Sequence, residues 1–179
     1  YVLVTVLEID PTLIGFIEAG GAIGMLVTSI YFASRKQIQF PLVIVKRSTF
    51  ATAAVVMLIG LPVLFPLPMM WNFVYYFVMM LLFGTLGVIT NTPLGVMFQT
   101  TITEEYRGRV FGIIEMMSMS AMPIGTLGYG VLFDLIPAYY ILFASGLILM
   151  ALVLLLLRPS ILEMAHPELK QTEGKVVTE

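Results

Sequence analysis

The segment EEYRGRVFGIIE, residues 104–115, places five charged side chains within twelve residues of a chain that is otherwise mostly apolar. Long apolar segments flank it on both sides, so it is typical of a short polar turn between two membrane spans. The second of these spans is predicted to begin at about Arg109. Because consecutive spans cross in opposite directions, a cytoplasmic location for this turn would fix the side of every other loop.

The composition of the chain indicates an integral membrane protein. Of its 179 residues, 59% are hydrophobic and 11% are charged, whereas soluble domains have about 25% charged residues. So few polar side chains do not suffice to cover the surface of a soluble protein. The apolar segments are continuous and long enough for helical spans, and they lack the alternation of an outer-membrane barrel. The absence of cysteine excludes disulfides and thiolate metal sites.

Five complete helical spans and part of a sixth are predicted. The complete spans lie at about residues 12–33, 49–65, 72–99, 109–133 and 138–157. Residues 1–7 have the composition of the far end of another span, so we interpret the sequence as the C-terminal piece of a longer protein. We therefore expect an all-α, polytopic membrane bundle at residues 1–160, with its first helix truncated, and a polar cytoplasmic tail at residues 161–179.

Prolines and glycines mark expected helix starts and bends. Pro11 suits the first turn of a helix, where its missing N–H group has no helical partner to lose. The predicted span at residues 72–99 would be roughly 40 Å long, which exceeds the ~30 Å hydrocarbon core of a bilayer. We expect this span to tilt or bend. The residues that allow a bend are Gly84, Gly87, Pro93 and Gly95.

All nine lysine and arginine residues are predicted to lie on one side of the membrane. They occur in the loops at residues 34–48 and 100–109 and in the polar segment after the last span, residues 158–179, whereas the turns at residues 8–11, 66–72 and 134–137 contain none. Cytoplasmic loops of membrane proteins carry the excess of basic residues. The pattern predicts a multi-pass protein of the cell membrane with a cytoplasmic C-terminus.

Two motifs and the number of spans resemble a known family. The motif EEYRGRVFGI at residues 104–113 lies between the fourth and fifth spans, counting the truncated one, and the glycine-rich EAGGAIG at residues 18–24 lies in the second. Together they resemble the C-terminal half of a major facilitator superfamily transporter, in particular the bacterial macrolide-efflux and siderophore-exporter branch. The resemblance covers residues 1–160. It implies a secondary active transporter that works by alternating access.

The resemblance also implies what the protein transports and with what partners. The expected activity is proton-coupled efflux of drug-like or other lipophilic small molecules. The expected partners are the lipid bilayer, the missing N-terminal six-helix half and a small-molecule substrate, with no nucleic acid, cofactor or metal. No phosphate-binding, zinc-protease or hydrolase motif occurs in the sequence, so we expect no enzymatic activity.

Three other functions are alternatives to transport. The chain could be a truncated half-carrier that has no transport of its own and acts only as an assembly partner in the membrane. A channel would require a ring of polar residues around a pore or a broken re-entrant loop. A membrane enzyme would require a cluster of polar catalytic residues. Neither of the last two features is apparent in the sequence.

Glu18 and Glu115 are the two acidic residues predicted inside the hydrocarbon region. A charged side chain at the bilayer centre costs ~2.5–3.5 kcal/mol on insertion scales, so an unpaired carboxylate is not expected to face lipid. A proton-coupled carrier needs a carboxyl group that is neutral in one state and charged in another, and both residues are candidates for this role. Alternatively, Glu115 pairs with Arg107 or Arg109, and Glu18 lies in a water-filled outer vestibule.

The charges of the turn itself are a candidate gate. We predict a cytoplasmic cluster of charges whose ion pairs break and form again as two halves of a carrier rock against each other. The cluster consists of Glu104, Glu105, Arg107 and Arg109. The alternative is that these charges only anchor the turn at the membrane surface.

Further polar and small residues are candidates for lining a cavity or packing helices. Thr90 and Asn91 lie beside Pro93, where they either line a substrate cavity or satisfy backbone groups freed by the proline. Ser118 and Ser120 are additional cavity candidates within a methionine-rich segment, whose methionines suit lipid contact, packing or a greasy cavity. The glycines are expected to permit close helix packing. These glycines are Gly20, Gly21, Gly24, Gly84, Gly125, Gly128 and Gly130.

Overall fold

The computed structural model describes residues 10–34, 40–65 and 68–157 of the chain, and all regular structure in these ranges is α-helical. The predicted helix remnant at residues 1–7, the tail at residues 161–179, and Arg35 and Lys36 of the first basic loop lie outside the described residues. The helices are α1 (Pro11–Ala33), α2 (Pro41–Ile59), α3 (Leu61–Leu64), α4 (Met69–Thr101), α5 (Glu104–Leu135) and α6 (Ala138–Leu156).

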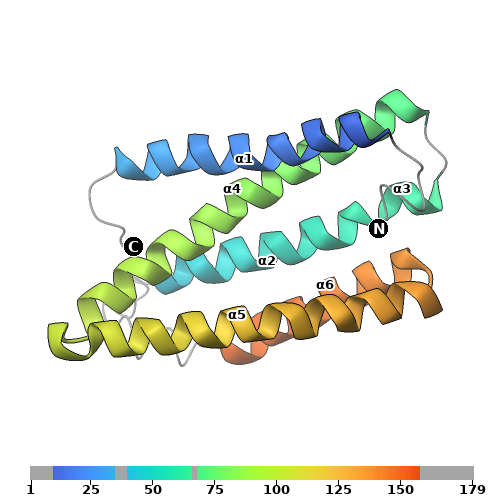
Figure 1. Ribbon diagram of the computed structural model, residues 1–179. Helices are drawn as coiled ribbons and strands as arrows, with labels where there is room; N and C mark the ends of the chain where they lie inside the picture. The colour runs from blue at the N-terminus through green and yellow to red at the C-terminus, as the bar shows by residue number, and fades with distance from the viewer. Residues whose placement is uncertain (1–9, 35–39, 66–67, 158–179) are drawn as a thin grey trace, which may run out of the picture.

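Five helical segments of the described chain are long and apolar enough to cross a membrane. They are α1, the continuous pair α2 and α3, α4, α5 and α6. Consecutive segments run in opposite directions, as Figure 1 shows by the colour change along the chain. The molecule therefore has the architecture of a helical membrane bundle, which confirms the predicted all-α fold.

The start of α1 shows how local sequence sets a helix end. Pro11 occupies the first helical position, as predicted, and the carboxylate of Asp10 accepts a hydrogen bond of 2.8 Å from the N–H of Thr12. This bond satisfies one of the N–H groups that have no partner within the helix. Because the hydrogen bond stabilises the charged carboxylate, it lowers the pKa of Asp10 below the ordinary value of 3.8.

The Asp10 cap should therefore be lost only in strong acid. A carboxylate with a lowered pKa stabilises the folded state above its ordinary pKa, and this contribution disappears as the pH falls through the lowered pKa. In an NMR titration in detergent micelles, the amide resonance of Thr12 should shift with a midpoint below pH 3.8. Asp10→Asn keeps a capping side chain without a titrating group and should remove this shift. A midpoint at or above pH 3.8 in the wild type would contradict the cap.

Helix α4 is the centre of the bundle. It runs obliquely across the molecule and packs against α1 and α2, and α2 in turn packs against α6 (Figure 1). The side-chain contacts show that α1 and α4 are parallel, because Gly20 meets Phe77 and Gly24 meets Leu81. Helices α2 and α4 are antiparallel.

Glycines bring the backbones of α1 and α4 together. A Cβ atom added to Gly24 would collide with the carbonyl oxygen of Leu81, and one added to Gly84 would collide with the carbonyl oxygen of Gly21. Gly20 lies 3.0 Å, measured from an added Cβ, from the carbonyl oxygen of Phe77. Helices in lipid gain stability from such close approach. The predicted packing role agrees with these contacts for the glycines at residues 20, 24 and 84. It is not borne out at Gly125, Gly128 and Gly130, where an added Cβ atom would meet nothing within 4 Å in the described chain.

Hydroxyl groups join α2 to α4 at the middle and at one end. The hydroxyls of Ser48 and Thr90 are 2.8 Å apart. Tyr75 donates a hydrogen bond of 2.6 Å to the carbonyl of Leu58, and Tyr76 donates one of 3.1 Å to the carbonyl of Ile59. The carbonyl of Leu58 would ordinarily accept from the N–H four residues later, but that residue is Pro62 and has no N–H. Tyr75 therefore replaces a donor that the sequence removes.

We expect Tyr75→Phe to destabilise the bundle by about 0.5–1.5 kcal/mol, the usual net contribution of one hydrogen bond. The loss should appear in SDS titration of the protein in detergent micelles. Tyr106→Phe is the matched control, because Tyr106 is exposed and no side-chain hydrogen bond joins it to the described part of the chain. Equal stability of the two variants would show that the Leu58 carbonyl has another donor.

Two helix starts differ from the sequence-based expectation. The second predicted span was expected from residue 49, but α2 begins at Pro41, so Lys46 and Arg47 lie in the helix and not in the loop. The span predicted from Arg109 begins at Glu104, so the turn is limited to Ile102 and Thr103. Long basic side chains extend toward water from the ends of spans, which permits charged residues within the helix.

The end of the third span also differs in detail. Helix α4 is longer than the predicted residues 72–99 by a few residues at each end, and its helical assignment continues through Pro93. Figure 1 shows it crossing the bundle at an angle to α2, which is the kind of arrangement expected for a span that is longer than the hydrocarbon core. The bounds of α1 and α6 agree with the predicted spans to within one residue.

Candidate functional site

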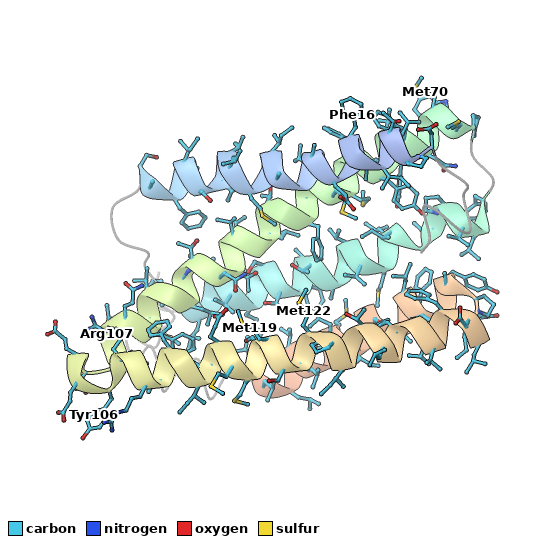
Figure 2. All side chains as sticks on the ribbon, in the orientation of Figure 1. Phe16, Met70, Tyr106, Arg107, Met119 and Met122 are labelled. Carbon is cyan, nitrogen blue, oxygen red and sulfur yellow. The ribbon has the colours of Figure 1, made fainter. Side chains whose placement is uncertain are left out.

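Helix α5 differs from every other long helix in the described chain because none of its residues is buried. It runs along one edge of the bundle and makes its main contacts with α6 (Figure 1). Met122 is 75% exposed, and Met119 projects from the same helix (Figure 2). The polar side chains predicted to serve transport are concentrated on this uncovered helix.

One face of α5 carries four residues that are spaced three or four positions apart along the helix. They are Glu115, Ser118, Met122 and Thr126. Glu115 is exposed and forms no ion pair with another described residue. The alternative of a structural pair with Arg107 or Arg109 is therefore not realised in this structure. Ser118 donates a hydrogen bond of 2.9 Å to the carbonyl of Ile114 in its own helix.

The four charges of the predicted gate lie at one end of the bundle, where α4 turns into α5 (Figure 2). Glu104 and Glu105 occupy the first turn of α5, where the partial positive charge of the helix N-terminus favours acidic side chains. Arg107 donates a hydrogen bond of 3.4 Å to the carbonyl of Ile102. Within the described residues no ion pair joins these charges, so the predicted gate ion pairs are not formed here.

All the lysine and arginine residues that the structure describes lie at this same end. Lys46 and Arg47 are in the first two turns of α2, and α2 is antiparallel to α4, so the start of α2 lies beside the end of α4. Asp10 and Asp134 lie toward the opposite end, at the start of α1 and the end of α5. The charge distribution along the bundle is therefore asymmetric.

Thr90 and Asn91 are directed to different surroundings. Thr90 is half-buried against α2, bonded to Ser48 and to the carbonyl of Leu86 at 2.8 Å each. Asn91 is exposed, and its amide donates a hydrogen bond of 2.9 Å to the carbonyl of Gly87. Thr90 therefore contributes to helix packing in this structure, whereas Asn91 remains on the surface of α4.

Glu18 and Ser120 complete the predicted set. Both are exposed, Glu18 on α1 and Ser120 on α5. Helix α1 packs on α4, and α5 has its main contact with α6, so these two helices do not share a substantial interface. The structure therefore does not bring Glu18 and Glu115 together in one pocket.

A hollow that sequence reasoning missed lies near the start of α4. Its volume is about 280 Å³, near the lower limit for pockets that hold drug-sized molecules. Its walls are almost entirely apolar, and the hydroxyl of one lining residue, Tyr75, donates a hydrogen bond to the carbonyl of Leu58. The spacing of its residues along α4 is the signal that predicts a common face. They are Trp71, Val74, Tyr75, Val78 and Met79.

Comparisons with known proteins give no match: neither a family model, nor a curated protein, nor a solved structure is significantly similar to this chain.

Proposed function

We propose that this chain is part of a secondary active transporter of the cell membrane, a half of a major facilitator-type carrier that exports lipophilic small molecules in exchange for protons. The C-terminus would be cytoplasmic, because the basic residues gather at the end of the bundle where α2 and α5 begin. The transporter would work by alternating access, with α1, α4 and α5 facing a second bundle across a central cavity.

The observation that carries this proposal is the position of Glu115. It lies three turns into a helix that is apolar enough to span a membrane, and the described chain provides it with neither a cover nor a counter-ion. A carboxylate in this position is not stable against lipid, so it requires water or another polar surface beside it. A water-accessible transport pathway along α5 would supply both, and would let the carboxyl group exchange a proton.

Transport by the full-length protein that contains this chain tests the proposal. We expect proteoliposomes to accumulate a lipophilic fluorescent dye when a pH gradient is imposed, and to stop when the gradient is collapsed by a protonophore. Protein-free vesicles measure passive dye entry. Dye movement that is equal with and without the gradient, for a panel of cationic, neutral and anionic dyes, would refute proton-coupled export.

A second candidate function is an assembly partner without transport of its own. The absence of any buried residue in α5 favours it, because a helix with no packed face requires a neighbour that the described chain does not provide. In this case the 179-residue chain alone would be inactive in proteoliposomes, while the full-length protein would transport. Transport by the isolated chain would exclude this alternative.

A further inference from the structure

Four helices, α1, α2, α4 and α6, form a unit that we call the platform. Glycines join α1 to α4, and the Ser48, Tyr75 and Tyr76 hydroxyls join α2 to α4. Between α2 and α6, a Cβ atom added to Gly146 would collide with the side chain of Met57 and would lie 2.9 Å from the carbonyl oxygen of Ala53. Each of these contacts fixes one backbone against another, so the platform helices hold each other in place.

Helix α5 is attached to this platform near its two ends. Near its start, the ring of Phe111 meets the ring of Phe98 of α4 edge to face, with centroids 6.3 Å apart. Near its end, the hydroxyl of Tyr129 lies 2.8 Å from the hydroxyl of Ser145 of α6. Ser145 donates its only hydroxyl hydrogen to the carbonyl of Ile141 at 2.7 Å. Tyr129 is therefore the donor in the bond between the helices.

Between these attachments, residues 112–128 extend for about 25 Å of helix. The hydroxyls of Ser118 and Thr126 bond to carbonyls of α5 itself, so within the described chain no hydrogen bond joins this stretch to the platform. A Cβ atom added to any of its glycines would meet nothing within 4 Å, in contrast to the glycines at the α1–α4 contact. Regions with so few buried contacts are the ones that open first in proteins.

We propose that α5 moves as a rigid unit against the platform, turning about its long axis, and that the hydrogen bond from Tyr129 to Ser145 is the latch that holds it in the described position. The two-residue turns at residues 102–103 and 136–137 tether both ends of α5 and oppose its departure from the bundle. Rotation would change what Glu115 faces. The proposal concerns the mechanics of the bundle and does not depend on the transported molecule or on transport itself.

Distances between spin labels test the proposal, and the absence of native cysteine allows labels to be placed without background. One pair, Leu127→Cys and Leu147→Cys, reports on α5 against α6; both positions are well exposed. A second pair, Ile30→Cys and Val96→Cys, reports on α1 against α4 within the platform. Pulsed electron paramagnetic resonance on the full chain in lipid nanodiscs should give a broader distance distribution for the first pair than for the second.

Removal of the latch should shift the first pair and leave the second unchanged. We expect Tyr129→Phe, and separately Ser145→Ala, to move or broaden the α5–α6 distribution by on the order of 2–5 Å, the scale of helix displacements in switching proteins. Tyr106→Phe, at an exposed tyrosine of the same helix, should have no effect. Equal widths for the two pairs in the wild type would overturn the moving helix. An α5–α6 distribution unaffected by both latch variants would overturn the latch.

Discussion

A single methyl group added at Gly84 or Gly24 is expected to cost the bundle about 1–3 kcal/mol of stability, the usual range for overpacking a close-packed contact. The added Cβ atom would collide with a backbone carbonyl oxygen of the facing helix, at Gly21 or Leu81, and a backbone atom cannot swing aside as a flexible side chain can. Relief requires α1 and α4 to separate along the whole contact. Gly84→Ala and Gly24→Ala should therefore unfold at lower SDS concentration than the wild type in detergent micelles.

Each of these variants has a matched control on its own helix. Gly87→Ala on α4 and Gly15→Ala on α1 add the same methyl group where an added Cβ meets nothing within 4 Å. Both should be as stable as the wild type or slightly more stable, since alanine favours helix formation over glycine. If all four variants had equal stability, the helices would not touch at these glycines, and the arrangement of α1 on α4 would be wrong.

The second large effect is expected at Glu115. In the full-length protein, Glu115→Gln should reduce proton-driven dye accumulation to the level of protein-free vesicles. Glutamine keeps the size and polarity of the side chain but cannot take up or release a proton. The variant carrier would therefore still bind its substrate, but the proton gradient would no longer drive transport of that substrate. Binding of the dye, measured by fluorescence anisotropy in detergent, should therefore persist while accumulation is lost. Glu18→Gln is measured in parallel as the other candidate for the coupling group.

Asp134→Asn is the control for this experiment. It removes a carboxyl group from the same helix, at the opposite end from the basic residues, and should leave accumulation unchanged. Undiminished accumulation by the Glu18→Gln, Glu115→Gln double variant would remove both residues from the coupling mechanism. If the wild type itself gave no gradient-dependent accumulation, the failure would belong to the proposed function and not to the assignment of the carboxyl groups.

The helices whose ends are set by proline or by a change of polarity were predictable from the sequence. Pro11 and Asp10 define the start of α1, and the apolar residues of α6 are continuous from Ala138. The starts of α2 and α5 were misplaced because charged residues were assigned to loops. Pro41 was a signal for the earlier start of α2, since proline suits a first helical position. Thr103 followed by two glutamates was a similar signal for α5.

The candidate site was less predictable, because it depends on which helices become neighbours. Ser48 and Thr90 are distant in sequence, and no local pattern indicates that their hydroxyls meet. The sequence also does not indicate that Glu115 lies on the one long helix of the described chain without a buried residue, because each long segment is apolar enough to be either packed or exposed. Apolar periodicity identifies spans, but in lipid it does not choose their partners.

The order of contacts also has a consequence for biogenesis. Helix α1 rests chiefly on α4, and α2 rests on α4 and α6, so these two helices, which precede α4 in the chain, find their main neighbours among the described helices only after α4 has been synthesised. Until then α1 and α2 lie in the bilayer or beside the translocon, and the glycines of α1 and Ser48 of α2 have not yet formed their contacts with α4. Among the described helices, α1 and α2 therefore do not pack chiefly against each other as a hairpin, and insertion of α4 is the step that gives both of them a main neighbour.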